Sequence, residues 1–381
     1  RKYHKRFRGM LQMSRLASKS LNTQYIDFPD MSGGWNCRDT EENIATNELA
    51  SVTNMTYADA KGRLRLRRGT GLALHTFSAP IGGMTWYNSK LCIAAGGSLW
   101  QWDDSGGGMG EIGALAGSAR PSFQEFGGEL YIATGGKLKK YDGTTLSTIE
   151  DSYSDTVGLF MRDGRFCCWR SSADYADYLY ASYFGDPATW TVPSGEMTDP
   201  DPVEIQIGYK MAGNIVAVMP MLSDLIIFKK DLVMRLVGGL INTEGIYEVA
   251  RNINVANQWS VANVGGSLFY IDKTKGAQLL EGVDTYGDIL PGDTLQKVNP
   301  YIRENLDEAD CRLWHLKMRN IIVFGIVDER CIPAYYHFGD SLPALQWEFA
   351  DNITEIVEPD RQRAYIPMLS KSPPLTEHVP D

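Results

Sequence analysis

Residues 87–103 read YNSKLCIAAGGSLWQWD, and residues 126–142 read FGGELYIATGGKLKKYD. The two segments start 39 positions apart (126 − 87), and seven of their 17 aligned positions are identical. Each places a Gly-Gly pair between short apolar stretches, which is typical of antiparallel strands joined by a tight turn. A repeat of about 40 residues made of short strands is typical of propeller blades, because a single small sheet cannot bury its own faces. The sequence therefore predicts an all-β chain, a β-propeller of about six to eight four-stranded blades with an N-terminal extension.

The strand pattern continues to the end of the chain with less regular spacing. We expect blades at 78–115 and 116–153, a longer third unit from Val157 to Trp190 with a loop at 191–206, and units near 215–238, 261–282, 311–338 and 353–367. A helical connector is predicted near 293–308, and hairpin turns are predicted at Gly82-Gly83, Gly96-Gly97, Gly127-Gly128 and Gly135-Gly136. The propeller is accordingly assigned to 78–381, a basic N-terminal arm to 1–25, and a lead-in segment with a ring-closing strand to 26–77.

The lead-in segment contains a short stretch in which arginine and leucine alternate from Arg63 to Arg67. A period of two indicates a strand, with the leucines facing inward and the arginines outward. We expect this strand, at 63–67, to close the ring with the last blade, because closure removes an exposed sheet edge. The outward basic strand would then present Arg63, Arg65, Arg67 and Arg68.

Charge is distributed unevenly along the chain. The first 20 residues carry seven basic residues and no acidic one, which leaves 30 bases against 47 acids, a net of −17, for the remainder. A basic arm on an acidic body is typical of an interaction segment, although a solvated terminus explains the same composition. An acidic body does not favour tight wrapping of DNA, but it lets DNA pass without adhering. The predicted partner-binding arm consists of Arg1, Lys2, Lys5, Arg6, Arg8, Arg15 and Lys19.

The sequence offers no constellation that favours catalysis. It lacks a nucleophile elbow and a phosphate-binding loop, and no cysteine or histidine pair has the spacing of metal ligands. The six cysteines are expected to be buried free thiols, and no cofactor and no membrane span are expected. Aromatic residues recur at equivalent positions of successive blades. We expect them to pack in the core, and a platform on which carbohydrates stack is the alternative. They are Trp86, Trp100, Trp102, Tyr131 and Tyr141.

Two regions resemble propeller proteins of bacteriophage tails. The first combines Asp27–Asn36 (DFPDMSGGWN), Asn47-Glu48-Leu49 with Asn54, and the arginine-rich Gly62–Gly69, and it resembles the opening of those proteins. The second, Leu179–Ser182 (LYAS) followed by Gly185–Trp190 (GDPATW), is similar to another hallmark of the group. The group includes the tail nozzle and packaged-DNA stabilisation proteins of short-tailed phages.

The resemblance implies a rigid unit in a ring of copies, typically a hexamer, below the portal and adaptor proteins. It implies tail fibre or plug proteins as further partners, and genomic DNA that passes through the ring channel without sequence-specific binding. We therefore expect a non-enzymatic structural virion protein of the tail nozzle or hub, assembled in the host cytoplasm, that helps to retain the genome until DNA ejection. Two alternatives stay open: a receptor- or glycan-binding propeller at the tail tip, and a propeller glycoside hydrolase.

Overall fold

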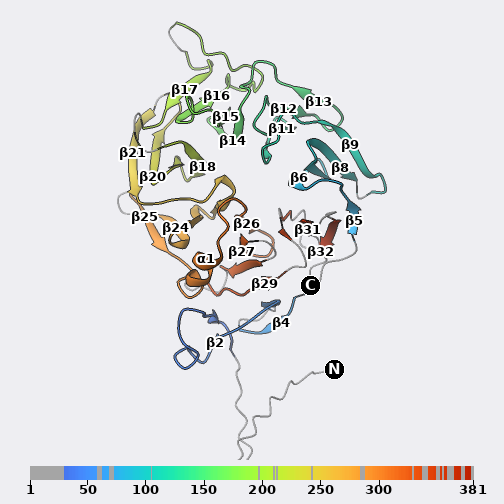
Figure 1. Ribbon diagram of the computed structural model, residues 1–381. Helices are drawn as coiled ribbons and strands as arrows, with labels where there is room; N and C mark the ends of the chain where they lie inside the picture. The colour runs from blue at the N-terminus through green and yellow to red at the C-terminus, as the bar shows by residue number, and fades with distance from the viewer. Residues whose placement is uncertain are drawn as a thin grey trace, which may run out of the picture.

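The computed structural model describes residues 30–57, 62–67, 73–103, 105–195, 198–208, 211, 213–241, 243–283, 288–327, 330–336, 342–348, 352–353, 356–357, 364–369 and 374–378. In these ranges, small antiparallel sheets are arranged around a common axis, and Figure 1 looks along that axis. The predicted β-propeller is thus confirmed. The predicted arm at 1–25, with its seven basic residues, lies outside the described residues.

Six blades are each made of four strands that are consecutive in the sequence. Blade one contains β6 (Ile81–Tyr87), β7 (Lys90–Ala95), β8 (Ser98–Asp103) and β9 (Gly108–Ala114). Blade two contains β10 (Ser122–Phe126), β11 (Glu129–Ala133), β12 (Lys139–Tyr141) and β13 (Leu146–Thr148). Blade three contains β14 (Thr156–Arg162), β15 (Arg165–Arg170), β16 (Tyr178–Ala181) and β17 (Val203–Gln206).

The next three blades follow the same order, with two short helical segments between them. Blade four contains β18 (Ile215–Met221), β19 (Asp224–Lys229), β20 (Leu232–Gly238) and β21 (Thr243–Arg251). The 3₁₀ turn η1 (Gln258–Ser260) precedes blade five, which contains β22 (Val261–Val264), β23 (Ser267–Asp272), β24 (Gly276–Val283) and β25 (Asp288–Asp293). Helix α1 (Asn299–Asn305) precedes blade six, which contains β26 (Arg312–Leu316), β27 (Ile321–Val327), β28 (Arg330–Tyr335) and β29 (Trp347–Glu348).

A seventh four-stranded sheet closes the ring by joining the two ends of the described chain. Three strands, β30 (Asn352–Ile353), β31 (Ala364–Leu369) and β32 (Pro374–His378), precede β5 (Ala73–Thr76) in its order. Strand β5 pairs antiparallel with β32. The prediction that residues 63–67 close the ring was therefore wrong, because β4 (Leu64–Leu66) pairs with β3 (Met55–Tyr57) in a separate sheet.

The apolar core lies in the seams between neighbouring blades rather than at one central point. Leu225 and Ile227 of β19 pack with blade three, whereas Ile226 and Phe228 of the same strand pack with blade five. Alternate residues of one strand thus serve both neighbours, as the pleat of a strand requires. The seams fix the blades in a rigid ring.

Glycine pairs have two different roles in the blades. Gly127 and Gly128 form the turn between β10 and β11 with positive φ angles, as the sequence predicted. Gly82 and Gly83 instead lie inside β6, so the prediction of a turn there was wrong. A Cβ atom on Gly83 would lie 2.8 Å from Cγ of Pro121, so blade two's leading segment approaches β6 too closely for a side chain.

Candidate interaction surfaces

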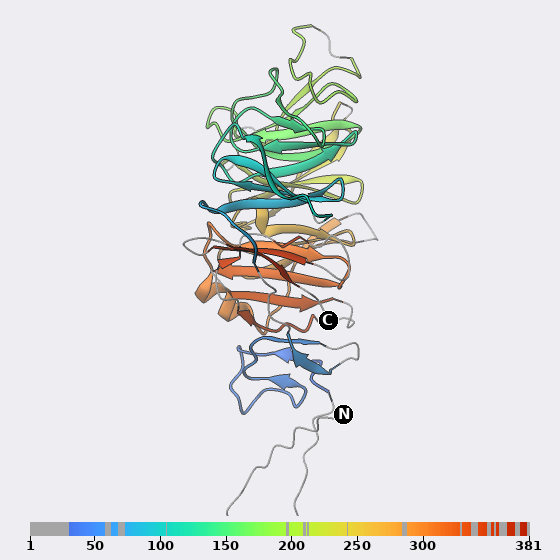
Figure 2. The ribbon, with the colours of Figure 1, turned by 90° about the vertical axis from the view of Figure 1, so that its right-hand side faces the viewer.

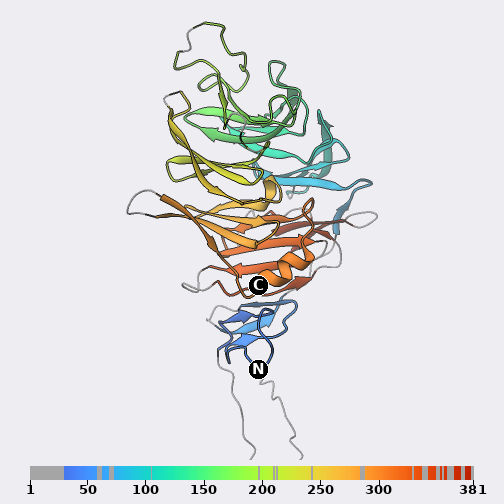
Figure 3. The ribbon, with the colours of Figure 1, turned by 60° about the vertical axis from the view of Figure 1, so that its left-hand side comes forward.

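The lead-in segment folds as a small β unit beside the ring. Strands β1 (Gly34–Trp35) and β2 (Glu48–Leu49) are parallel, and β3 and β4 are antiparallel. Figures 2 and 3 show this unit next to the outer part of blade six, on one side of the ring. We call residues 30–57 and 62–67 the docked lead-in.

Backbone and aromatic contacts attach the docked lead-in to blade six. The Trp35 amide donates to the carbonyl of Ala344 at 2.7 Å, and the Trp347 indole donates to the carbonyl of Met55 at 2.7 Å. The ring of Tyr57 packs edge-on against that of Tyr335, with centroids 4.9 Å apart. These contacts cover the outer strand of blade six, which would otherwise be an exposed sheet edge.

Gly34 explains why the lead-in carries a Gly-Gly pair. Its φ of +73° is a conformation that residues with a side chain rarely adopt. A Cβ atom at this position would lie 2.8 Å from the amide nitrogen of Ala344. Only glycine therefore allows the lead-in backbone to approach blade six this closely.

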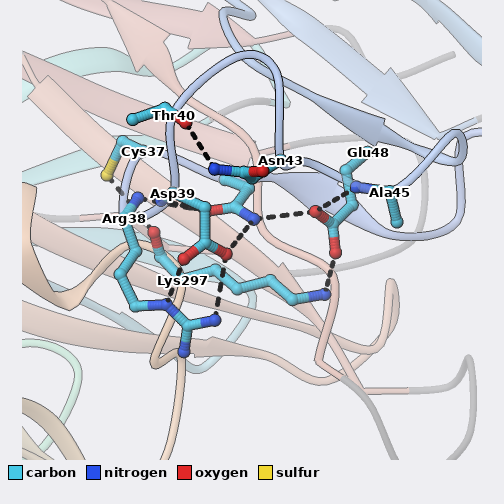
Figure 4. A network of polar contacts seen from close by, with 9 residues as sticks. Cys37, Arg38, Asp39, Thr40, Asn43, Ala45, Glu48 and Lys297 are labelled. Atoms are coloured by element: carbon cyan, nitrogen blue, oxygen red, sulfur yellow. Dashed lines mark hydrogen bonds and ion pairs between the residues drawn. The ribbon is translucent and has the colours of Figure 1, made fainter.

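A network of polar side chains centres on Asn36, which is 2% exposed. Its Nδ2 donates to Asp39 Oδ2 at 2.9 Å and to Glu48 Oε2 at 2.7 Å, while its Oδ1 accepts from the amides of Arg38 and Asp39. Lys297, in the connector before α1, forms an ion pair with Glu48 at 2.6 Å (Figure 4). One buried amide thus joins two parts of the lead-in, and Glu48 joins the lead-in to the propeller.

The network keeps its two carboxyl groups ionised. Burial alone raises the pKa of Glu48, but hydrogen bonds from Asn36, Lys297 and the Ala45 amide outweigh burial, so the pKa lies below its usual value. Hydrogen bonds from Arg38 and Asn36 lower the pKa of Asp39 to about 2. Both carboxylates therefore carry charge at neutral pH and accept the hydrogen bonds that hold the lead-in in place.

The predicted outward basic strand has a different orientation in the structure. Leu64 packs against the core, as expected, but Leu66 is 70% exposed and Arg65 and Arg67 are partly buried, so the expected facing was wrong at these three positions. The guanidinium of Arg67 lies 5.7 Å from the ring centroid of Trp347, and burial lowers its pKa. Arg63 is exposed, as expected, and Arg68 lies outside the described residues.

The long connection between β16 and β17 projects from blade three at the top of Figure 1. Arg165, which is 1% exposed, holds its base: the guanidinium donates to the carbonyls of Ser182 at 2.8 Å, Asp201 at 2.5 Å and Asp199. Within the connection, the amide of Trp190 donates to the Asp151 carboxylate at 2.6 Å. The GDPATW motif thus forms part of an anchored loop at the rim of the ring.

The channel of the propeller is divided by η1. Gln258 donates to the carbonyl of Val157 in blade three at 3.1 Å, and Asn257 donates to the carbonyl of Cys311 before blade six at 2.9 Å. The guanidinium of Arg120 lies 4.4 Å from the Trp259 ring centroid. Trp259 lines two cavities, of about 610 and 430 Å³, and therefore stands between them.

The recurring aromatic residues divide between core and channel. Tyr131 and Tyr141 are buried, and Trp100 packs edge-on against Phe77, so these rings serve the predicted core packing. Trp86 lines the 610 Å³ cavity together with Trp259. Sequence reasoning did not find Trp259, because it lies outside the repeated blade strands.

The cysteines are all free thiols, and five of the six are buried, as expected. Burial raises the pKa of Cys92, Cys311 and Cys331 to about 12, so these thiols are weak nucleophiles. Within the described ranges, no three histidine, cysteine or acidic residues are grouped so as to hold a metal ion. None of the described helices has the length and apolar character needed to cross a bilayer.

Comparisons with known proteins identify the fold alone. No protein-family profile and no curated protein sequence matches the chain. A chain in a crystal structure of the mitotic checkpoint complex is similar, with a TM-score of 0.54 and 13% identity over 86% of this chain and 97% of that chain. The β-propeller domain of Cps50 (Swd1) from Myceliophteria thermophila is also similar, with a TM-score of 0.51 and 11% identity over 81% of this chain and 99% of that domain.

Proposed function

We propose that this chain is a non-enzymatic structural subunit of a bacteriophage tail, placed in a nozzle or hub ring around the DNA channel. The observation that carries the proposal is the docked lead-in. Its contacts with the propeller use Gly34, Trp35 and Glu48, which belong to the motifs that resemble the opening of phage tail propellers. In this proposal, the motifs exist to fix the start of the chain on the rim of a rigid propeller.

The proposal assigns separate roles to the propeller, the docked lead-in and the arm. The propeller supplies a stiff wedge, because its core lies in the seams between blades. The docked lead-in fixes residue 31 and its neighbours beside the propeller, and the basic arm at 1–25 precedes it in the sequence. The arm would bind a neighbouring ring, such as the adaptor, through its seven basic and several apolar residues.

The negative charge of the chain supports a position of this protein around the DNA channel. Residues 21–381 carry a net charge of −17, from 30 bases and 47 acids. This acidic part of the chain repels the phosphates of a passing DNA duplex. Tight binding to the DNA backbone would require basic residues that neutralise the phosphates. A ring of copies would therefore guide DNA without retaining it by adhesion.

The test compares the full-length chain with a variant that lacks residues 1–20. We expect rings of uniform copy number in electron micrographs of the full-length chain, and an unchanged circular dichroism spectrum and melting temperature for the variant. The variant should lose assembly with a partner ring. Monomers that bind glycans on an array would favour the tail-tip alternative, and polysaccharide turnover abolished by one carboxylate substitution would overturn the structural proposal.

A further inference from the structure

The 610 Å³ cavity on the axis of the ring differs chemically from the surface around it. Its volume lies within the range of about 300–1,000 Å³ that is usual for binding sites. The 18 described residues that line it include no aspartate, glutamate, lysine, arginine or histidine, although 22% of the whole chain is charged. A charged group that entered would meet no opposite charge among these lining residues, so the lining favours a neutral occupant.

Strand edges form much of the wall of this cavity. Strands β6, β10, β14 and β18 each stand first in the order of their sheet, and Figure 1 shows the labelled β6, β14 and β18 toward the axis. The edge of a first strand presents backbone N–H and C=O groups. One such group is already used, because the Leu159 amide donates to Ser122 Oγ at 3.2 Å. The wall thus offers neutral donors and acceptors spaced along strands.

Adaptable apolar side chains complete the wall. Trp86, Phe123, Met161 and Met219 line the cavity, and each is only partly buried. Methionine side chains adjust to different apolar shapes, and aromatic rings provide large contact areas. This lining favours an occupant with apolar side chains over one that presents only hydroxyl groups.

Two exposed apolar residues lie in turns that join the first and second strands of their blades. Leu222, in the turn from β18 to β19, is 74% exposed, and Met318, in the turn from β26 to β27, is 48% exposed. Both turns join the first and second strands of a blade, so they lie on the same face of the ring. The cavity residues Met161 and Met219 lie in the second halves of β14 and β18, toward these turns. The cavity and the exposed residues therefore belong to one face.

We propose that this face binds an extended, uncharged, apolar segment of a partner protein, and that part of the segment enters the cavity. Backbone amides of the segment pair with the strand edges, as in other cases of strand addition. Its apolar side chains contact Trp86, Met161 and Met219 inside the cavity, and Leu222 in the turn that follows the lining residue Pro220. The inference concerns the propeller alone and does not depend on the proposed place in a tail.

The test uses the full-length chain and two arrayed peptide libraries of about nine residues with blocked ends. One library is uncharged and alternates apolar residues with serine or threonine, and the other carries two aspartates in each peptide. We expect saturable binding to members of the uncharged library at least about ten-fold tighter than to their acidic counterparts. Leu222→Glu and Met219→Glu should each weaken binding by about ten-fold or more, or about 1.4 kcal/mol.

Tyr247→Glu is the matched control, because Tyr247 is 53% exposed on β21, the last strand of blade four. It should bind like the unmodified chain. Leu222 is so exposed that its substitution leaves the fold intact, which circular dichroism would verify. Absence of binding to the uncharged library, equal binding to the acidic one, or binding unaffected by Leu222→Glu would overturn the proposal. Binding of a neutral oligosaccharide array, with no peptide binding, would assign the cavity to sugars and also overturn it.

Discussion

Asn36 shows how one side chain in the lead-in fixes several others. The amide donates to two carboxylates and accepts from two backbone N–H groups, so all its hydrogen-bonding capacity is used within 2.7–3.1 Å. Asn36 belongs to a motif that was recognised by its resemblance to other proteins. The sequence alone does not show which residues form hydrogen bonds with its side chain. Glu48 lies 12 residues away and Lys297 lies in the propeller, and such distant pairs cannot be deduced from spacing.

Replacing Asn36 by alanine should loosen the docked lead-in. The change removes the donor to Glu48 and Asp39 and the acceptor of the Arg38 and Asp39 amides, and we expect a loss of about 1–3 kcal/mol in local stability. Hydrogen–deuterium exchange should accelerate in residues 30–57 and stay unchanged in blade two. Asn43→Ala, which removes an exposed bond to Thr40, is the control. Unchanged exchange in Asn36→Ala would show that the network does not hold the lead-in.

Arg165 holds the loop between β16 and β17 in place, as Asn36 holds the docked lead-in. Lysine keeps the charge but cannot reach several carbonyls with one planar group, so Arg165→Lys should cost about 2–4 kcal/mol. Thermolysin should then cleave the connection at 182–202 faster than in the unmodified chain. Arg251→Lys, at an exposed ion pair with Glu248, is the control. Equal cleavage rates in both variants would contradict this role.

At the scale of elements, the sequence predicted strands better than it predicted their partners. The alternation at 63–67 identified β4 correctly as a strand. It did not identify β3 as the partner, and a period of two leaves open which of the two faces is buried. Leu66 is exposed, whereas the neighbouring Arg67 packs over Trp347. The sequence predicted the positions of the blades well, because the repeat and the turn residues can each be recognised within a short stretch of sequence.

The docking of the lead-in should weaken at acidic pH. The folded-state pKa of Glu48 lies below its usual value, so its stabilising contribution is complete above about pH 4.3, the usual pKa of the unfolded group, and is lost as the pH falls through the folded-state value. Exchange of residues 30–57, corrected for intrinsic rates, should therefore rise between pH 6 and pH 3.

Glu48→Gln tests the origin of this pH dependence. The variant should be less stable than the unmodified chain at pH 6, since its amide cannot form the ion pair with Lys297. It should also show a smaller change between pH 6 and pH 3. Glu41→Gln, at an exposed position, should behave like the unmodified chain. A pH dependence in Glu48→Gln equal to that of the unmodified chain would assign the effect to other groups.

At the scale of the whole molecule, the ring depends on the pairing of β5 with β32. The sequence predicted the propeller and placed a closing strand before residue 78, but it selected 63–67 instead of Ala73–Thr76. The closing strand is short and carries no repeat, so no local pattern distinguishes it. The position of Trp259 between the two cavities could not be predicted either, because η1 lies between blades and outside the repeated strands.

Removal of residues 370–381 should open the ring. The truncation deletes β32 and leaves the edges of β5 and β31 without their partner, so we expect a lower melting temperature and concentration-dependent aggregation. Differential scanning calorimetry and light scattering would measure both effects. A chain that lacks only 379–381 is the control and should retain its stability. An unchanged melting temperature after the larger truncation would show that β32 is dispensable for closure.

The proposed place in a phage tail can be tested by a cryo-EM reconstruction of tails from virions that carry this chain. We predict a ring of propellers around the DNA channel, with each docked lead-in held on blade six and each basic arm in contact with an adjacent ring. A virion whose tail lacks the chain, or one in which the chain is an isolated monomer away from the channel, would rule out this place.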